Sequence, residues 1–312
     1  MADDSNWERT VLEKLAMAAL KEQRAARQWG IFFKLVGLGV VVLIVGMARG
    51  WLDGRDGIPS GRHTAVVELT GVIESEGRAS AENVIAGLQA AFKDKDTQGV
   101  IVRINSPGGS PVQAGQINDE MRRLRAKYPN TPLYAVVEDV CASGGYYVAV
   151  AADKIFVDKA SMVGSIGVIL DSFGVVGTME KLGVERRVIT AGENKAFLDP
   201  FSPLSAEHRQ YAQQMLDEIH RQFIDTVKAG RGVRLKQSPE LFSGLVWNGS
   251  KSIEIGLADA LGSVDTVARD VIKAEALVDY TVKEKLTERL ARRFGGLLGS
   301  SIASVLAQAR LR

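Results

Sequence analysis

The sequence is short of the residues on which many binding and catalytic sites depend. It has one cysteine, Cys141, among 312 residues, so an internal disulfide and a cysteine-based zinc site are both excluded. Its three histidines, His63, His208 and His220, are far apart and form no metal-ligand pattern. If the protein is a hydrolase, we therefore expect it to use no bound metal, and we expect no other cofactor. These counts leave a histidine-based catalytic triad open.

Neither sign of charge dominates. Lys and Arg total 39 against 37 for Asp and Glu, a net charge of +2, whereas a dedicated nucleic-acid binder carries a basic patch over most of a domain. With 46% hydrophobic and 24% charged residues, the chain can bury a sizeable core and is not disordered. Its length allows one large domain or two small ones, at about 100–200 residues each.

Charge is almost absent from residues 30–48. This run, GIFFKLVGLGVVVLIVGMA, holds one charge, Lys34, and roughly 20 apolar residues span a bilayer as a helix. Trp29 and Trp51 bracket it, where interfacial aromatic residues are expected, and Lys34 can extend to its nearer surface. We predict a transmembrane helix over residues 30–48, preceded by a helical cytoplasmic tail over residues 1–29.

A cleavable signal peptide and a buried core helix are the alternatives for this run. A signal peptide needs a short basic region before it, whereas here 29 residues precede it and five of them are acidic. Positions 10–29 carry four basic residues and positions 48–67 carry three. With Lys34 added to the first side, this bias favours the amino end inside and the bulk of the protein outside the cytoplasmic membrane.

From residue 63 onward, strand-like and helix-like runs alternate, which predicts an α/β domain with parallel strands. No second copy of this unit is visible, so we predict one domain over residues 63–282, after a linker rich in glycine and charge over residues 49–62. The predicted strands are 65–69, 99–104, 133–137, 154–157, 163–170 and 185–190, and the predicted helices are 79–92, 112–127, 143–152 and 205–228.

Residues 283–312 carry seven basic and two acidic residues, with apolar residues at roughly helical spacing. A basic amphipathic helix on an anionic membrane surface is one interpretation of this segment. Packing against its own domain or a neighbouring subunit, and disorder, are the others.

Two glycine-rich corners follow predicted strands. In the first, residues 105–110 (NSPGGS), paired glycines leave backbone N–H groups unshielded, which suits an anion or a developing oxyanion. An ordinary strand-to-helix turn is the alternative, and the Gly-Lys-Ser/Thr of a phosphate loop is missing. In the second, residues 141–147 (CASGGYY), Ser143 opens a helix, where it is either a nucleophile or only an N-cap. Two similar corners allow one to present a nucleophile and the other to supply oxyanion donors.

A serine nucleophile needs a base. His63 falls in the predicted linker, and we expect His208 and His220 on a solvated helix face. A lysine can act as the base if burial near apolar groups lowers its pKa. Lys195, in the loop AGENKAF over residues 191–197, is a candidate, and a solvated loop lysine is the alternative.

Five motifs, in this order, resemble the signal peptide peptidase A family, bacterial membrane-bound serine proteases of the Clp protease and crotonase superfamily. The similarity runs from about Val66 to Val267. The motifs are INSPGG (104–109), ASGGYYVA (142–149), VGSIGV (163–168), AGENKAFLDPF (191–201) and LVWNGSKSIEIGLADALG (245–262).

The resemblance implies Clp protease/crotonase-like parallel sheets with helices, preceded by one transmembrane helix. It implies that Ser143 is the nucleophile and Lys195 the general base. The N–H groups of Gly108 and Gly144 would form the oxyanion hole, and Ser165 would hydrogen-bond the lysine.

The implied function is that of a membrane-anchored serine endopeptidase. It would degrade remnant signal peptides and other apolar or unfolded peptides through an acyl-enzyme. It would lie in the bacterial inner membrane as a single-pass protein, with its catalytic domain outside the cytoplasm. A homo-oligomer with active sites at subunit interfaces is expected, and no nucleic-acid partner. The Ser143–Lys195 dyad pairs either within or between chains. A crotonase-type acyl-CoA enzyme and a non-catalytic membrane scaffold of the same fold are the alternatives; the anchor and the Ser143/Lys195 pair count against the first, and the intact pair against the second.

Overall fold

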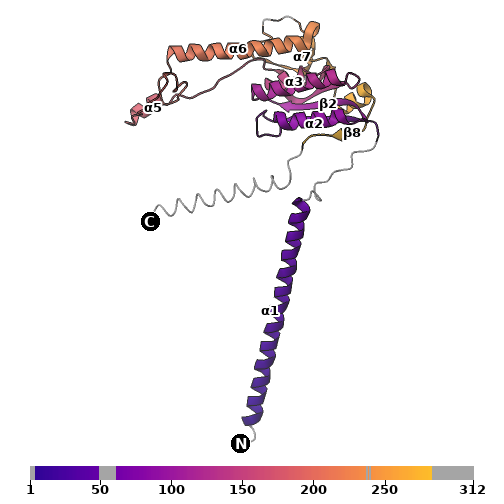
Figure 1. Cartoon of the computed structure of the whole chain (residues 1–312), viewed down its shortest axis with the longest axis vertical. Helices are drawn as coiled ribbons and strands as arrows, with labels where there is room; N and C mark the ends of the chain where they lie inside the picture. The colour runs from indigo at the N-terminus through magenta and orange to yellow at the C-terminus, as the bar shows by residue number, and fades with distance from the viewer. Residues whose placement is uncertain (1–3, 49–60, 237, 239, 283–312) are drawn as a thin grey trace. The chain divides into compact units, whose positions relative to one another are not determined.

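The computed structural model describes residues 4–48, 61–236, 238 and 240–282 (Figure 1). The chain divides into two compact units, Met1–Gly57 with Glu284–Arg312, and Ile58–Lys283. Most of the predicted linker and the whole predicted amphipathic segment 283–312 lie outside the described residues, so these assignments and the predicted domain boundaries stay predictions.

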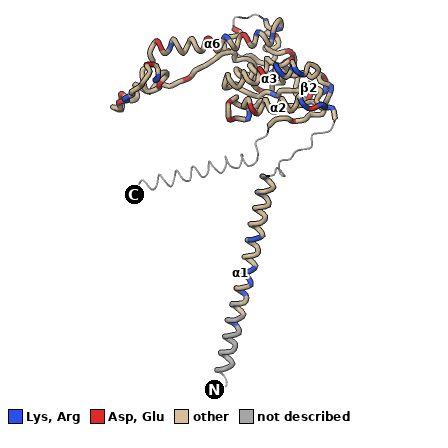
Figure 2. Tube along the Cα trace, viewed as in Figure 1, with Lys and Arg blue, Asp and Glu red and all other residues tan. Residues whose placement is uncertain are grey.

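In the first unit, helix α1 (Asp4–Ala48) is one continuous helix of 45 residues, so the predicted tail and the predicted span belong to one element. Within it, Leu20–Val42 is long and apolar enough to cross a membrane, judged by length and composition. Its aromatic rings Trp29, Phe32 and Phe33 pack on one another at 5.7–5.8 Å. The last third of α1 carries almost no charge (Figure 2).

An eight-stranded sheet forms the centre of the second unit. Its main order is β6-β5-β3-β2-β1-β8, with β4 pairing with β3 and β7 pairing with β4. All pairs are parallel except β5 with β6. The strands are β1 (His63–Thr70), β2 (Thr97–Ser106), β3 (Leu133–Ala142), β4 (Lys154–Val157), β5 (Met162–Gly164), β6 (Val246–Asn248), β7 (Ala260–Leu261) and β8 (Leu277–Asp279). The predicted class, α/β with parallel strands, is confirmed.

Strand β3 is shared between two neighbours. Its first half, residues 134–136, pairs with β4, and its last residues, 140–142, pair with β5. Between them, Glu138 and Asp139 are exposed. This fork brings the carboxyl ends of β2, β3 and β5 together at one edge of the sheet, which is where parallel α/β sheets commonly hold ligands.

Helices cover the sheet and bury the main core. Helix α2 (Ala81–Lys93) packs against β1 and β2, and α4 (Gly144–Ala149) packs against β2 and β3. Helix α3 (Pro111–Lys127) packs against both α2 and α4 (Figure 1). A smaller cluster, built around Ile101, Val136 and Phe156, packs against Val267 and Ala268. The remaining helices are α5 (Val176–Lys181), α6 (Ala206–Arg231), η1 (Gly232–Arg234), α7 (Gly249–Glu254), α8 (Val264–Thr266) and η2 (Val267–Ile272).

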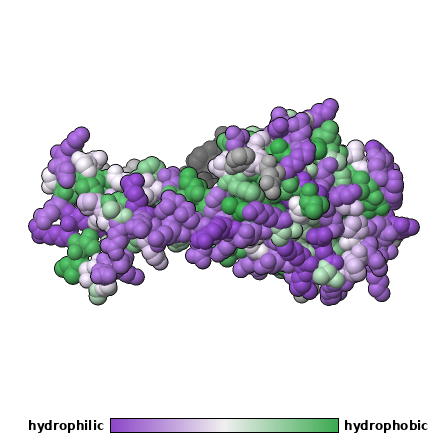
Figure 3. Space-filling view, turned by 90° about the horizontal axis from the view of Figure 1, so that it is seen from above, coloured by the Kyte–Doolittle hydropathy of each residue, from purple (hydrophilic) through white to green (hydrophobic). Residues whose placement is uncertain are grey.

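Residues 167–204 form a projecting segment in which no residue is buried. Figure 1 shows its helix α5 at the end of α6 that is farther from the sheet, and Figure 3 shows hydrophobic side chains on that end of the molecule. Within residues 167–204, Ile169, Phe173 and Ile189 are 86%, 78% and 99% exposed.

Two predicted strands are wrong in this region. The predicted strand 163–170 ends at Gly164, because the backbone turns at Ser165, whose φ is +53°. The predicted strand 185–190 is irregular and exposed, because none of its residues has a neighbouring strand to pair with.

Candidate active site

The first glycine corner follows β2 and is held by hydrogen bonds to the preceding loop. The Ile73 N–H donates to the Gly108 carbonyl, and the Ser110 N–H donates to the Ile73 carbonyl, both at 2.8 Å. The Ser106 hydroxyl donates to the Gly71 carbonyl at 2.7 Å. The corner is therefore a fixed turn rather than a loose loop.

The second corner holds Ser143 in a strained conformation. Its φ is +51°, a region that costs a non-glycine residue free energy and that clusters at functional sites. Backbone hydrogen bonds fix it on both sides, from the Ser143 N–H to the Gly164 carbonyl and from the Tyr147 N–H to the Ser143 carbonyl, both 2.9 Å. Ser143 precedes α4, but its side chain makes no capping hydrogen bond. The N-cap alternative for this hydroxyl is therefore wrong.

The two corners touch. A Cβ placed on Gly108 would lie 2.7 Å from Ser143 Cβ and 2.7 Å from the Gly144 nitrogen. Gly108 also has a φ of +102°. Both facts require glycine at this position, so that the backbone of the first corner can approach the serine.

Backbone N–H groups gather beside Ser143. The Gly144 N–H belongs to the first residue of α4, so it has no acceptor within the helix. The Gly108 N–H donates to Ser106 Oγ at 3.2 Å, whereas the Gly109 N–H makes no hydrogen bond in the described part of the chain. Gly109 N lies 3.3 Å from the Cβ position of Gly144. The geometry thus adds Gly109 as a donor that sequence reasoning missed, although the paired glycines were the signal for it.

Ser165 lies beside this site, since it directly follows Gly164, whose carbonyl accepts from the Ser143 N–H. Its own N–H donates to the Leu245 carbonyl at 2.7 Å. Among the predicted site residues, the structure thus brings together Gly108, Ser143, Gly144 and Ser165.

Lys195 lies apart from these residues. It is exposed, in a run of turns within the projecting segment, and its N–H donates to the Gly192 carbonyl at 3.1 Å. In the described residues no hydrogen bond joins its ammonium group to Ser143 or Ser165. A single chain therefore presents the predicted nucleophile and the predicted base in separate places.

The histidines differ from their predicted settings. His63 is the first residue of β1 and fully buried, with Nε2 3.2 Å from Tyr280 Oη and 3.1 Å from Thr97 Oγ1. His208 and His220 are half-buried rather than solvated, and both tie α6 to another segment. These corrections follow from long-range contacts that local sequence does not reveal.

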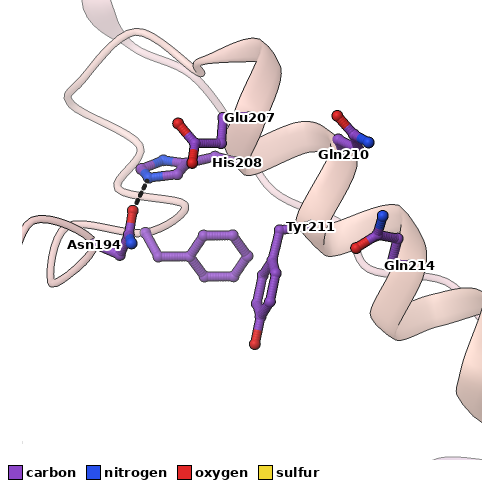
Figure 4. Close-up of a pocket in the computed structure, with 7 residues that line it drawn as sticks. Asn194, Glu207, His208, Gln210, Tyr211 and Gln214 are labelled. Atoms are coloured by element: carbon purple, nitrogen blue, oxygen red, sulfur yellow. Dashed lines mark hydrogen bonds between the residues drawn. The ribbon is translucent and has the colours of Figure 1, made fainter.

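The two histidines of α6 contact the chain next to Ser165 and the chain next to Lys195, at different points along the helix. His220 Nε2 lies 3.1 Å from the carbonyl of Ile166, the neighbour of Ser165. His208 Nε2 lies 3.1 Å from Oδ1 of Asn194, the neighbour of Lys195 (Figure 4). Twelve residues separate the histidines, which is about 18 Å along a helix.

A buried ion pair joins the end of α6 to the loop that contacts α4. Arg231, 1% exposed, makes two hydrogen bonds to Asp259 at 2.8 and 2.9 Å, and donates to the Gly256 carbonyl. Burial raises the pKa of Asp259, but hydrogen bonds from Arg231 and the Ile155 N–H outweigh it, so the net pKa is lowered. In the same loop, the Leu257 carbonyl accepts a 2.8 Å hydrogen bond from Tyr146, in the first turn of α4.

Over the described ranges, no group of three or more His, Cys, Asp or Glu side chains is placed to hold a metal ion. The thiol of Cys141, two residues before Ser143, is fully buried, and burial raises its pKa.

Residues 125–278 match peptidase family S49. A putative signal peptide peptidase SppA from Enterococcus faecium is 30% identical over 233 residues, covering 72% of this chain and 67% of that protein. The chloroplastic serine protease SPPA of Arabidopsis thaliana is 29% identical over 265 residues, covering 82% of this chain and 38% of that protein.

A protein of Brucella melitensis biotype 1, named Na(+)/H(+) antiporter NhaA, is 41% identical over 245 residues. The match covers 77% of this chain, but the chain spans only about a third of that relative, 32%. The Enterococcus relative is matched over two thirds of its length. This chain belongs to peptidase family S49, the signal peptide peptidase A family, whose fold is that of the Clp proteases and crotonases.

Proposed function

We propose that this protein is a serine endopeptidase in which Ser143 attacks the peptide carbonyl. The observation that carries the proposal is the meeting of the two glycine corners at a strained serine. Ser143 has a φ of +51° and a hydroxyl that makes no hydrogen bond within the described chain, and backbone N–H groups lie beside it. Such donors stabilise an oxyanion without moving during the reaction, typically by about 2.7–4 kcal/mol each.

The proposed reaction uses these groups together with the Lys195 amine. A neutral Lys195 amine takes the proton from Ser143 Oγ, and Oγ bonds to the carbonyl carbon. The carbonyl electron pair moves to its oxygen, which the N–H of Gly144 and of Gly108 or Gly109 stabilises. As the oxygen reforms its double bond, the C–N bond breaks and Lys195 gives its proton to the leaving amine. Water then attacks the acyl-enzyme and loses a proton to Lys195. As the ester C–O bond breaks, Lys195 returns that proton to Ser143 Oγ and the acid is released.

We infer that the lysine comes from a second copy of the chain. Asn194 and Ile166, the chain neighbours of Lys195 and Ser165, are hydrogen-bonded to α6 at points about 18 Å apart along the helix. The projecting segment that carries Lys195 exposes the large apolar side chains of Ile169, Phe173 and Ile189, and exposed apolar surface is typical of contact sites with another chain. Burial against a second chain would cover these side chains and would favour the neutral amine that a base requires.

The substrates we propose are remnant signal peptides and other apolar or unfolded peptides, cleaved next to the bacterial inner membrane. The stretch Leu20–Val42 would anchor the chain there, with the catalytic domain outside the cytoplasm. An anchored enzyme meets membrane peptides at high local concentration. The domain assignments of the sequence fit this proposal, with a tail, a span, a linker and one peptidase domain.

A fluorophosphonate probe, which reacts with activated serine hydroxyls, tests the nucleophile. We expect the full chain in detergent to be labelled on Ser143 and Ser143→Ala to remain unlabelled and inactive, with unchanged circular dichroism. Ser263→Ala is the matched control, since Ser263 caps α8 and hydrogen-bonds Thr266. An unlabelled wild-type protein would favour a non-catalytic scaffold, and turnover of acyl-CoA thioesters without peptide cleavage would favour the crotonase-type alternative.

Mixed assemblies test the origin of the lysine. Chains carrying Ser143→Ala and chains carrying Lys195→Ala should each be inactive alone. Co-expressed, they should regain a fraction of wild-type peptidase activity, because some interfaces then combine an intact serine with an intact lysine. Co-expression of two differently tagged Ser143→Ala chains is the control. Inactive mixtures that still assemble would mean that the dyad pairs within one chain.

A further inference from the structure

Three contacts hold the turn that carries Lys195 against α6. Asn194, directly before the lysine, meets His208, and Phe197, two residues after it, packs on His208 and Tyr211 (Figure 4). These four side chains, Asn194, Phe197, His208 and Tyr211, are called the clasp below. They line a pocket of about 580 Å³ together with Glu207, Gln210 and Gln214.

The polar contact of the clasp has a defined direction. His208 Nε2 lies 3.1 Å from Asn194 Oδ1, which can only accept, so the shared hydrogen is on the imidazole ring. The other face of the clasp is aromatic. The Phe197 ring meets the His208 ring edge-to-face at 5.4 Å and the Tyr211 ring edge-to-face at 5.6 Å. Both are geometries that aromatic pairs prefer.

The helix spacing makes the clasp a single unit. His208 and Tyr211 are three residues apart on α6, so they present their side chains on one face of the helix. The N-terminus of α6 is capped at this point, because the Ser205 hydroxyl accepts a hydrogen bond from the His208 N–H at 3.0 Å. The turn is also internally bonded, from the Phe197 N–H to the Asn194 carbonyl at 3.0 Å.

The clasp therefore fixes the backbone on both sides of Lys195 and leaves the lysine side chain free. The projecting segment buries no residue, so within one chain the clasp and the ion pair of Asp199 with Arg186, in the same segment, are the main contacts that hold this turn. A general base must be placed within hydrogen-bond distance of the proton it takes, and a displacement of about 1 Å can cost on the order of 100-fold in rate.

We propose that His208 and Phe197 are positioning residues that hold Lys195 in register on α6 for proton transfer. They touch neither the substrate nor Ser143. The proposal rests on the proposed function, because it gives the clasp a role only if Lys195 is the base. It adds that α6 and the lysine turn move as one body when chains assemble.

The test uses the full-length protein in detergent and a chromogenic apolar peptide ester. We expect His208→Ala and Phe197→Ala each to lower kcat by about 10- to 100-fold with KM changed by less than about twofold. We expect the acidic limb of the kcat–pH profile to move to higher pH, because a loosened lysine is more solvated. His208→Gln keeps a side-chain donor for Asn194 and should recover part of the lost kcat.

Gln210→Ala is the matched control, since Gln210 lines the same pocket, is exposed and makes no side-chain hydrogen bond within the described chain. It should keep wild-type kcat and pH profile. Light scattering measures the mass of the assembly and so shows whether each variant still forms the wild-type complex. If Phe197→Ala does not assemble, Phe197→Leu takes its place, because leucine keeps apolar packing without the aromatic ring.

The outcomes separate the two proposals. Inactive Lys195→Ala together with wild-type kcat in His208→Ala and Phe197→Ala would overturn the positioning role and keep the base. Full activity in Lys195→Ala would overturn the base and the positioning role with it. Equal loss in Gln210→Ala and His208→Ala would mean that the pocket acts only through general stability.

Discussion

The glycine corners and the projecting segment belong to the same family motif set, yet they are built in opposite ways. Around Ser143, the backbone is fixed by hydrogen bonds, and Ser106, Cys141 and Gly144 are buried. Around Lys195, no residue of the segment is buried, and large apolar side chains face solvent. One chain thus holds Ser143 in a rigid setting and leaves Lys195, the proposed base, on an uncovered surface.

The difference teaches where stability and activity reside. Free energy of folding comes from the sheet and the helices α2, α3 and α4, whose side chains form the main core. The projecting segment adds little to that core, so its apolar residues gain most by contact with another surface. Substitutions in the sheet and its covering helices, called the body below, should therefore alter the free energy of unfolding. Substitutions in the projecting segment should alter assembly.

The largest effect should follow from Arg231→Met. It breaks the buried pair and leaves Asp259 with only Arg234 as an ion-pair partner; breaking a buried pair typically costs about 3–5 kcal/mol of unfolding free energy. Urea unfolding followed by tryptophan fluorescence measures it. Arg269→Met is the control, because the exposed Arg269–Asp270 pair should contribute less than about 1 kcal/mol. Equal losses of unfolding free energy in the two variants would mean that the buried pair stabilises the protein no more than an exposed pair does.

Gly108→Ala should remove most of the activity. The new methyl group would press on Ser143 Cβ and the Gly144 nitrogen in a backbone region that disfavours alanine. Loss of one oxyanion donor alone corresponds to about 100- to 1,000-fold in kcat. Gly115→Ala, in helix α3 with open space at its Cβ position, should keep full activity. Steady-state hydrolysis decides, and an active Gly108→Ala protein would contradict the close approach of the corners.

Acid should weaken the body by a smaller amount. The carboxyl of Asp259 has a pKa below its ordinary value of 3.8 in the folded protein. A lowered pKa adds stability that is complete above pH 3.8 and is lost as pH falls through the lower folded pKa. The urea concentration at the unfolding midpoint should therefore decrease as pH falls below 3.8, and it should decrease less steeply in Asp259→Asn than in the wild type. The same slope in both proteins would assign the acid sensitivity to other carboxylates.

The smallest effect on stability should come from Ile189→Ala. This side chain is 99% exposed, so the unfolding free energy should change by less than about 0.5 kcal/mol, while light scattering should show weaker assembly. Ile117→Ala is the matched change in the body, where a fully buried isoleucine is worth about 2–5 kcal/mol. A destabilised Ile189→Ala monomer would remove the contrast between the two regions.

Local sequence predicted the body well and the projecting segment poorly, for a physical reason. Strand β4 and helix α3 follow from β-branched runs and helical spacing, because there the burial agrees with the local pattern. Residues 185–190 carry the same kind of run without a neighbouring strand, so their pattern predicts a strand that does not form in one chain.

The site divides in the same way. Gly108, Gly144 and Ser143 follow directly from two strand-to-helix corners, which local sequence reveals. The joining of His220 to Ile166, of His208 to Asn194 and of Arg231 to Asp259 depends on partners 54, 14 and 28 residues away. No local pattern marks such pairs, so these supports appear only in three dimensions.

The burial of Cys141 makes the single thiol of the protein unreactive. Its thiol is inaccessible and its pKa is raised, so thiol-directed reagents find no reactive partner in the wild-type chain. A cysteine introduced by Ile189→Cys would then be the sole reactive thiol. Spin labels or crosslinkers placed there would report which surfaces meet when copies of the chain come together.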